Sequence, residues 1–348
     1  MEEVIKSDIR RFSEEEMVAE FAKMGEPKFR AKQVHEWLWK KSARSFDEMT
    51  NLSKDLRTKL ADQFAFFSVT ENIVQKSSDG TVKLGMKLHD DRLVEGVMIP
   101  DEDRNTACVS SQVGCSLSCS FCATGFLKRE RNLEAGEIYD QVVLLNKHAL
   151  EHSGKQLTNI VYMGMGEPML NYDNVMQSIR YITSPDGLNM AQKRITVSTS
   201  GVVRGIRRMA EEGMKFNLAL SLHAPTDEKR DKIMDINRSN PLDEVMDALN
   251  YFYQKTGNKV TFEYILFDKF NDSLEDAEHL YGLTLKVPSF INVIEYNNVA
   301  GVELHKAKRE KRDAFVAYLR DKGVNVAIRR SRGKDIDAAC GQLANKNK

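Results

Sequence analysis

The sequence lacks an excess of charge of either sign and lacks any long apolar run. Lysine plus arginine equals aspartate plus glutamate, at 51 each, so net charge gives no reason to expect a nucleic-acid or membrane partner. No apolar run approaches the roughly 20 residues needed to cross a bilayer, and the first residues, MEEVIKSDIRRF, lack the apolar core of a secretion signal. We therefore expect a cytoplasmic protein with no membrane partner.

Cysteine is also scarce, at five in 348 residues. An odd number in a chain of this size does not indicate the disulfide framework of a secreted protein. Three of the five, Cys115, Cys119 and Cys122, crowd into the stretch GCSLSCSFCATG, as metal ligands do in reducing compartments. Cys108 and Cys340 stand apart, and most lone cysteines are inert buried side chains.

The length favours one large domain with a smaller one attached. Residues 1–67 are predicted to form a small N-terminal helical accessory domain. Ser13 with Glu16 three residues later indicates a capping box, and FRAKQVHEWLWKKS places apolar residues at helical spacing. Residues 68–104 contain TVKLGMKLH and RLVEGVMIP, which predict a connecting β-hairpin.

Strands and helices alternate over residues 105–335, which predicts an α/β domain with a parallel sheet. Six βα units fit either an open doubly wound sheet or a partial (β/α)6 barrel, and in both the working site lies at the carboxyl ends of the strands. Residues 336–348 form a C-terminal segment whose last residues, ANKNK, are predicted to be a loose tail. The predicted strands are NTACVSS, TNIVYMG, RITVSTS, KFNLALSLH, KVTFEYILF and SFINVIEY.

The three clustered cysteines favour an iron–sulfur cluster over zinc. Their C-x3-C-x2-C spacing is not a pair of zinc knuckles, and the neighbouring residues offer no fourth ligand, although His148 or His223 could supply one from a distance. The alternative is a [4Fe–4S] cluster held by three thiolates, with one iron left open to a small molecule.

Polar and glycine residues follow several of the predicted strands. The loop IVYMGMGEPML carries Gly166, which permits close backbone approach, and Glu167, which can accept a hydrogen bond from an ammonium group. Taken alone, such residues more often form turns or cap strands. The others at this edge are Ser198, Ser221, Leu222, His223 and Asn297.

The cysteine spacing, with Phe121 before the third cysteine, resembles the signature of the radical S-adenosylmethionine (SAM) superfamily. The resemblance implies that SAM binds the open iron of a [4Fe–4S] cluster held by Cys115, Cys119 and Cys122. It also implies a partial barrel and a SAM site formed by Gly166, Glu167, Ser198, Ser221, Leu222, His223 and Asn297.

The segments CVSSQVGCSLSCSFCATG, MGMGEP and IDAACGQL, in this order, resemble the RlmN/Cfr family of radical SAM enzymes that methylate adenosine in RNA. This resemblance covers nearly the whole chain, including GEPKFRAKQVHEWLWKK. It implies that Cys340 carries the methyl group, that Cys108 resolves the intermediate through a transient disulfide, and that Glu95 accepts a proton. Pattern alone would instead place Glu95 on the solvent face of an alternating strand.

The family also implies cosubstrates and partners. Two SAM molecules are consumed per turnover, the RNA substrates are ribosomal RNA and transfer RNA, and an electron donor such as flavodoxin or ferredoxin is needed. We expect a monomer that methylates C2 of adenosine, because Pro168 after GMGE fits the C2 enzymes better than the C8 enzymes. Three readings stay open: a Cfr-like C8 methyltransferase, a radical SAM enzyme of another reaction class, and a zinc-stabilised RNA-binding protein.

Basic residues gather near the C-terminal end, over residues 306–334. The group from Arg329 to Lys334, just before the Cys340 loop, is predicted to contact RNA or substrate, since such groups can follow phosphates. The helical accessory domain is predicted to contact RNA as well. Its two tryptophans, Trp37 and Trp39, are predicted to be core residues.

Overall fold

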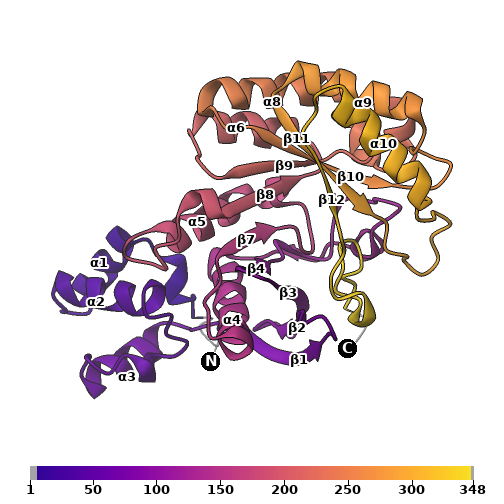
Figure 1. The fold of residues 1–348 in the computed structure, drawn as a ribbon. Coiled ribbons are helices and arrows are strands. Elements are labelled where there is room, and N and C mark those ends of the chain that lie inside the picture. The colour runs from indigo at the N-terminus through magenta and orange to yellow at the C-terminus, as the bar shows by residue number, and fades with distance from the viewer. Residues whose placement is uncertain (1–5, 346–348) are drawn as a thin grey trace.

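The structure, a computed structural model, describes residues 6–345. Figure 1 shows a small helical part at the N-terminal end beside a larger part in which helices cover the outer side of a curved sheet. Within the described residues, no helix is long and apolar enough to span a bilayer.

The N-terminal part is a group of short helices with its own apolar contacts. The predicted capping box is present, because Ser13 Oγ accepts from Glu16 N at 3.2 Å and Glu16 Oε2 accepts from Ser13 N at 2.7 Å. Trp39 is buried, as predicted, and stacks on Tyr181, whereas Trp37 is only partly buried against the core. The elements are η1 (Ile9–Arg11), α1 (Glu14–Lys23), α2 (Lys28–Trp39), η2 (Phe46–Glu48) and α3 (Lys54–Gln63).

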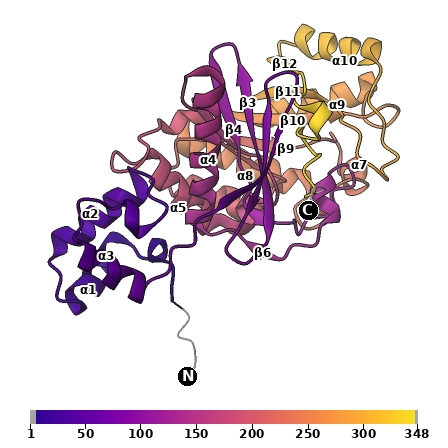
Figure 2. The same ribbon diagram turned by 90° about the horizontal axis from the view of Figure 1, so that it is seen from below.

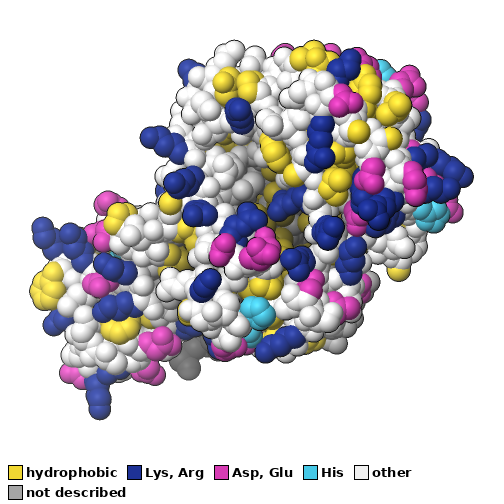
Figure 3. Space-filling model, viewed as in Figure 1, with side chains coloured by type: hydrophobic (Ala, Val, Ile, Leu, Met, Phe, Trp, Pro, Cys, Tyr) yellow, Lys and Arg dark blue, Asp and Glu magenta, His cyan; other side chains and the backbone are white. Residues whose placement is uncertain are grey.

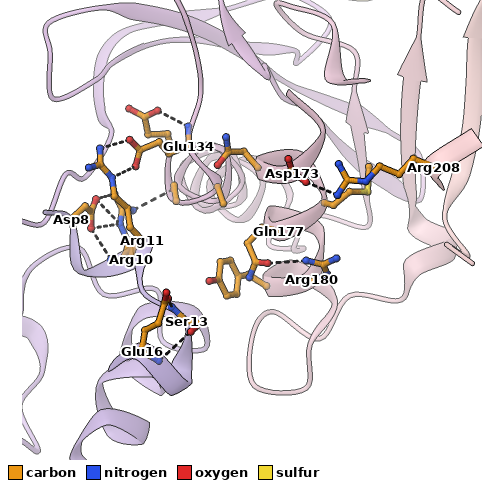
Figure 4. A pocket seen from close by; sticks show the side chains of 16 residues that line it. Asp8, Arg10, Arg11, Ser13, Glu16, Glu134, Asp173, Gln177, Arg180 and Arg208 are labelled. Carbon is orange, nitrogen blue, oxygen red and sulfur yellow. Dashed lines mark hydrogen bonds and ion pairs between the residues drawn. The ribbon is translucent and has the colours of Figure 1, made fainter. Parts of the chain in front are cut away.

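A buried arginine fastens this part to the barrel. Arg10 Nη1 lies 2.9 Å from Asp140 Oδ2 on α4 (Ala135–Ser153), and Arg10 Nη2 lies 3.0 Å from Asp8 Oδ2. Figure 4 shows the pocket around this contact, where Arg11 also pairs with Glu134 across the junction. Charges of both signs line the pocket, and several of them pair with one another.

One ten-stranded sheet forms the centre of the larger part. Neighbouring strands from β1 to β4 are antiparallel, and those from β4 through β7 to β12 are parallel. In order across the sheet, the strands are β1 (Thr70–Lys76), β2 (Val82–Lys87), β3 (Leu93–Asp101), β4 (Arg104–Cys108), β7 (Asn159–Tyr162), β8 (Ile195–Thr199), β9 (Asn217–Ser221), β10 (Val260–Leu266), β11 (Ser289–Glu295) and β12 (Val326–Arg329).

The six predicted βα units are all present, and β12 follows as a further parallel strand that was not predicted from the sequence. Strands β7 to β11 consist mainly of buried or partly buried residues, as expected where helices cover a sheet, whereas β12 has one buried residue. Besides α4, the helices are α5 (Tyr172–Thr183), α6 (Val203–Glu211), α7 (Asp227–Asp231), α8 (Leu242–Thr256), α9 (Leu274–Lys286) and α10 (Arg309–Asp321). The short elements are β5 (Gln112–Val113), η3 (Ala123–Phe126), β6 (Arg131–Asn132), η4 (Pro168–Asn171), η5 (Gln192–Arg194), η6 (Asp235–Ser239) and η7 (Lys334–Ile336).

The predicted hairpin corresponds to β2 and β3, but it belongs to the main sheet. A third strand, β1, precedes it, and β3 pairs directly with the first barrel strand, Val97 opposite Cys108. Lys83 of β2 also lies opposite Val97. Residues opposite one another in a sheet project to the same face, so Lys83, Val97 and Cys108 share a face, and so does Glu95 two residues before Val97.

The C-terminal segment crosses from β12 back to the β1–β2 turn, joining the two edges of the open sheet. Gly333 N donates to Asp79 Oδ2 at 2.9 Å, and Ser78 N donates to Asp335 Oδ2 at 3.1 Å. Figures 1 and 2 show this segment, in yellow, beside the indigo-to-purple strands β1–β3. The prediction of a loose tail is wrong for residues 344–345, whose backbone N–H groups bind Glu95, and the rest of that stretch lies outside the described residues.

Candidate active site at the carboxyl ends of the strands

The three clustered cysteines lie in one tight loop between β5 and β6. Cys122 N donates to Cys119 O at 3.2 Å, and Leu117 N donates to Cys115 Sγ at 3.4 Å. The loop closes on itself at Gly114, which has φ +73° and where a Cβ would lie 2.3 Å from a backbone oxygen. The loop is therefore a compact structure that a larger residue at position 114 would disturb.

The arrangement of these thiols fits a [4Fe–4S] cluster held by three cysteines. Burial raises the pKa of Cys115 to about 11 and that of Cys119 well above its usual value, and metal binding would ionise both thiols. Within residues 6–345, no three His, Cys, Asp or Glu side chains converge as ligands of a single ion. His148 Nε2 lies 3.3 Å from Glu71 Oε1, and His223 Nδ1 accepts from the backbone N–H of Ile265. Thiolates of a cluster bind separate irons, so they need not converge on one point.

The glycine-rich loop after β7 is pressed against the entrance of the cysteine loop. Gly166 has φ +94°, and a Cβ there would lie 2.5 Å from the side chain of Gln112. The buried Glu167 carboxylate accepts from Ser200 N at 2.8 Å and from Met169 N at 3.1 Å, while burial raises its pKa. These two bonds leave lone pairs on the carboxylate that could accept from a ligand.

The ends of β8 and β9 meet beside this loop. Ser198 Oγ and Ser221 Oγ are 3.2 Å apart, and Leu222 is completely buried. His223 has φ +55°, a conformation rare for residues other than glycine and one that clusters at functional sites. Burial lowers the pKa of His223 to about 3, so its ring is neutral, and it contacts the Phe121 ring at 4.8 Å between centroids.

Sequence reasoning missed Arg230, which is fully buried behind these strand ends. Its guanidinium donates to the carbonyl oxygens of Ser200, Ser221 and Leu222 at 2.6, 3.3 and 3.2 Å. Burial lowers the pKa of Arg230 to about 10, so it stays charged at neutral pH. In the sequence TDEKRDK it is one charge among many in a short helix, so no local pattern marked it out.

Cys340 lies against the cysteine loop. Ala123 N donates to Gly341 O at 2.7 Å, and Thr124 Oγ1 donates to Leu343 O at 2.7 Å. Asn297, after β11, donates its side-chain amide to Cys340 O at 3.3 Å. Cys340 is exposed as a residue, but many protein atoms lie around its thiol. Desolvation by these atoms, together with the charge of nearby Glu263, raises the pKa of Cys340.

Cys108 and Glu95 project toward the same region from the sheet. Cys108 is buried, and this burial, together with the nearby Cys340 thiol, raises its pKa above the usual range. Glu95 is 4% exposed, so it is not the solvent-facing residue that strand alternation alone would suggest. Its Oε1 lies 3.3 Å from Lys83 Nζ, and its Oε2 accepts from Ala344 N at 2.8 Å.

The basic residues at the end of β12 and just after it lie near this site. Arg329 is about half exposed, and its Nη1 is 3.8 Å from Glu263 Oε1, while Arg332 lies 3.6 Å from Asp101. Figure 3 shows Lys and Arg side chains gathered around the recessed centre of this face. Contact of Arg329 to Lys334 with RNA stays a prediction.

Two family models match the chain. Residues 7–65 match the ribosomal RNA large subunit methyltransferase N-terminal domain, and residues 109–281 match the radical SAM superfamily. These two matches correspond to the helical part and to most of the barrel.

Similar proteins match nearly the whole length. A probable dual-specificity RNA methyltransferase RlmN of Cytophaga hutchinsonii is 55% identical over 342 residues, which cover 98% of this chain and 94% of that protein. One of the same description from Flavobacterium johnsoniae is 48% identical over 344 residues, covering 99% of both chains. The crystal structure of a radical SAM methyltransferase from Sphaerobacter thermophilus superposes with a TM-score of 0.92 at 40% identity, covering 97% of this chain and 99% of that one.

Full-length identity at this level agrees with the sequence motifs and with the fold. The chain therefore belongs to the RlmN family of methyltransferases, within the radical SAM superfamily.

Proposed function

We propose that this chain methylates C2 of adenosine in large-subunit ribosomal RNA and in transfer RNAs, through a methyl group carried on Cys340. The observation that supports this most is the position of Cys340. The Ala123–Gly341 hydrogen bond holds the backbone next to Cys340 against the cysteine loop, and the Cys340 thiol is near enough to Cys108 to affect the pKa of Cys108. The relatives' name, dual-specificity RNA methyltransferase, supports two kinds of RNA substrate, and the matching N-terminal family is named for large-subunit ribosomal RNA.

Adenine C2 explains why two thiols and a radical are needed. It is an electron-poor aromatic carbon without a lone pair, so it cannot attack the methyl group of SAM directly. A thiolate can, because sulfur is a strong nucleophile once deprotonated. Cys340 would therefore take the methyl from one SAM molecule by displacement, after its thiol loses a proton.

The strand ends would hold SAM. Glu167 has acceptor capacity left for the ammonium group, and Gly166 lets the backbone approach closely. Behind them, Arg230 fixes the carbonyl groups of the strand ends and so keeps the pocket in shape. The residues proposed to bind SAM are Gly166, Glu167, Ser198, Ser221, Leu222, His223 and Asn297.

Cys115, Cys119 and Cys122 would hold the [4Fe–4S] cluster. When bound, that cluster would supply the electron that cleaves a second SAM molecule to methionine and a 5′-deoxyadenosyl radical, with flavodoxin or ferredoxin as electron donor. The methyl group on Cys340 would lose a hydrogen atom to this radical, and its carbon would then bond to C2 of the adenine.

Glu95 and Cys108 would complete the reaction. Glu95 would accept the proton from C2, and the unpaired electron of the adduct would pass to an electron acceptor, for which the oxidised cluster is suited. The Cys108 thiolate would then attack the sulfur of Cys340, so that the S–S bond forms as the C–S bond breaks, and the released methylene carbon would take up a proton to become the methyl group on C2. A reductant would restore both thiols. The face shared by Glu95 and Cys108 on β3 and β4 supports this division of roles.

One experiment tests this proposal. The protein is purified without oxygen, its iron and sulfide are measured, and it is incubated with SAM, reductant and RNA. We expect a methyl group on the Cys340 peptide by mass spectrometry, 2-methyladenosine in the digested RNA, and a stable RNA adduct in Cys108→Ala. Zinc without iron, or an unmodified Cys340 after SAM treatment, would overturn the proposal. 8-Methyladenosine would instead support the Cfr-like alternative.

A further inference from the structure

The inner face of β2 carries a buried lysine that the proposed reaction does not use. The Lys83 side chain is only 3% exposed, and both faces of β2 are covered along most of its length. An ammonium group is costly to bury unless it is paired and hydrogen-bonded. The contacts that Lys83 makes must therefore offset the cost of burying its charge.

Lys83 has two partners, from two distant parts of the chain. Its Nζ lies 3.3 Å from Glu95 Oε1 on β3, and it donates to Asp337 O at 3.4 Å. Lys83 lies opposite Val97 in the sheet register, so it projects from the same face as Glu95. Asp337 lies three residues before Cys340, so the same ammonium group contacts both the carboxylate and the chain that leads to the methyl-carrying thiol.

The other oxygen of Glu95 binds the same segment on the far side of Cys340. Glu95 Oε2 accepts from Ala344 N at 2.8 Å and from Asn345 N at 3.2 Å. Asn345 also donates from its side chain to Leu93 O at 2.8 Å. Lys83 therefore binds the C-terminal segment before Cys340, and Glu95 binds it after Cys340.

We propose that Lys83 is a positioning residue for the proton transfer from adenine C2. It orients Glu95 through the ion pair and ties this carboxylate to the C-terminal segment through the Asp337 carbonyl, while the Ala123–Gly341 hydrogen bond keeps Cys340 itself in place. This inference rests on the proposed function, in which Glu95 accepts the C2 proton. Lys83 itself touches neither SAM nor RNA in this role.

This role predicts that the two halves of the reaction respond differently to loss of Lys83. The first methyl transfer needs Cys340 and SAM but not Glu95. Proton removal at C2 needs Glu95 in a defined orientation, and small misplacements of a catalytic group can slow a step by about a hundredfold. A residue with only a structural role would affect both steps together.

The experiment compares Lys83→Met with Lys87→Met. Lys87 lies on the same strand, but it is half exposed and pairs with Asp91 at the surface. For Lys83→Met we expect a methylated Cys340 at the wild-type level and a kcat for RNA methylation lowered by about tenfold to a hundredfold, with little change in the KM for RNA. Lys83→Arg should restore part of the rate, and Lys87→Met should match the wild type.

A double variant gives the sharper result. Adding Lys83→Met to Glu95→Gln should lower the rate no further than Glu95→Gln alone, because both changes act on one step. Additive losses, a wild-type rate in Lys83→Met, or loss of Cys340 methylation together with the rate would each overturn the inference.

Two further comparisons keep the inference separate from folding and from the proposed function. If Lys83→Met does not fold, Lys83→Gln keeps a donor for the Asp337 carbonyl while removing the charge beside Glu95, and the same outcomes apply to it. If the wild-type protein makes no 2-methyladenosine, the proposed function fails. If it does and Lys83 proves dispensable, only the inference fails.

Discussion

The cysteine loop is formed by residues close together in sequence, whereas the site that holds Cys340 is formed by residues far apart in sequence. Cys115, Cys119 and Cys122 lie within eight residues, and the loop's own backbone bonds shape it. The position of Cys340 instead depends on contacts between distant segments: the C-terminal segment binds the end of the cysteine loop through the Ala123–Gly341 hydrogen bond and also contacts β2 and β3, with Lys83 and its partner Asp337 separated by 254 positions. The radical-generating part is thus local, whereas the methyl-carrying part depends on the sheet and on how the segment docks. Each part should therefore fail separately.

The largest expected effect comes from replacing one cysteine of each part. Cys119→Ala should lose the cluster, and with it SAM cleavage and RNA methylation, because two thiolates leave the cluster short of a ligand. Cys340→Ala should keep the iron and cleave SAM, but form no methylated RNA. Iron content, 5′-deoxyadenosine release and nucleoside analysis distinguish the two variants. Loss of iron in Cys340→Ala would contradict the separation.

A smaller effect is expected where the C-terminal segment turns toward the β1–β2 turn. Gly333 has φ +63°, and a Cβ there would lie 2.7 Å from the Ala338 side chain. Gly333→Ala should displace Cys340 and lower RNA methylation about tenfold to a hundredfold, with the iron content unchanged.

Gly323→Ala is the matched control for this change. Gly323 also has a positive φ, +81°, but no atom lies within 4 Å of its added Cβ. Gly323→Ala should introduce similar backbone strain but leave RNA methylation at the wild-type level. Equal losses in both variants would mean that strain, and not the docking of the segment, sets the rate.

The same contrast explains what the sequence could and could not predict. The cysteine loop and the placement of polar residues at the strand ends follow from local spacing and from the βα alternation, whereas the SAM-binding role of the strand-end residues came from the family resemblance. Glu95 required the family resemblance, because a charged residue in an alternating strand indicates solvent. Lys83 and Arg230 carried no signal at all, since their burial depends on contacts between segments distant in sequence.

The two hairpin strands were predicted at the right residues, but their pairing with β1 and β4 in the main sheet was not predicted. TVKLGMKLH and RLVEGVMIP do form strands, yet their pattern does not tell which strand pairs with β3. That pairing places Glu95 and Cys108 on one face, and the crossing of the C-terminal segment covers that face. Both facts are set by tertiary contacts, which period-two alternation does not encode.

The junction with the helical part offers a stability test that should leave both parts of the site in place. Arg10 is buried between Asp8 and Asp140, so Arg10→Met would leave two buried carboxylates without that cation. Breaking a buried ion pair typically costs about 3–5 kcal/mol. We expect that loss in chemical unfolding, with iron bound and Cys340 methylated as in the wild type. Arg11→Met, at the more exposed pair with Glu134, should cost about 1 kcal/mol or less.

The smallest expected effect is a pH dependence of the docking of the C-terminal segment. Burial opposes ionisation of Asp79, but the hydrogen bond from Gly333 N and those from Thr81 and Ser77 outweigh it and lower the pKa of Asp79 to about 2. The ordinary value is about 3.9, so the folded state favours the charged form. The resulting stabilisation is present above about pH 4 and is lost as the pH falls from about 4 to about 2.

Hydrogen exchange of the segment's backbone amides can measure this term. At neutral pH, Asp79→Asn should weaken protection of the Gly333 amide by about 1–2 kcal/mol, because a charge-assisted hydrogen bond is lost. Below about pH 4 the wild type should approach the variant, since its own carboxyl becomes protonated. Asp103→Asn, an exposed acid in the β3–β4 turn, should show no such convergence. A gap between wild type and Asp79→Asn that stays constant with pH would mean that Asp79 holds the segment by its shape and not by its charge.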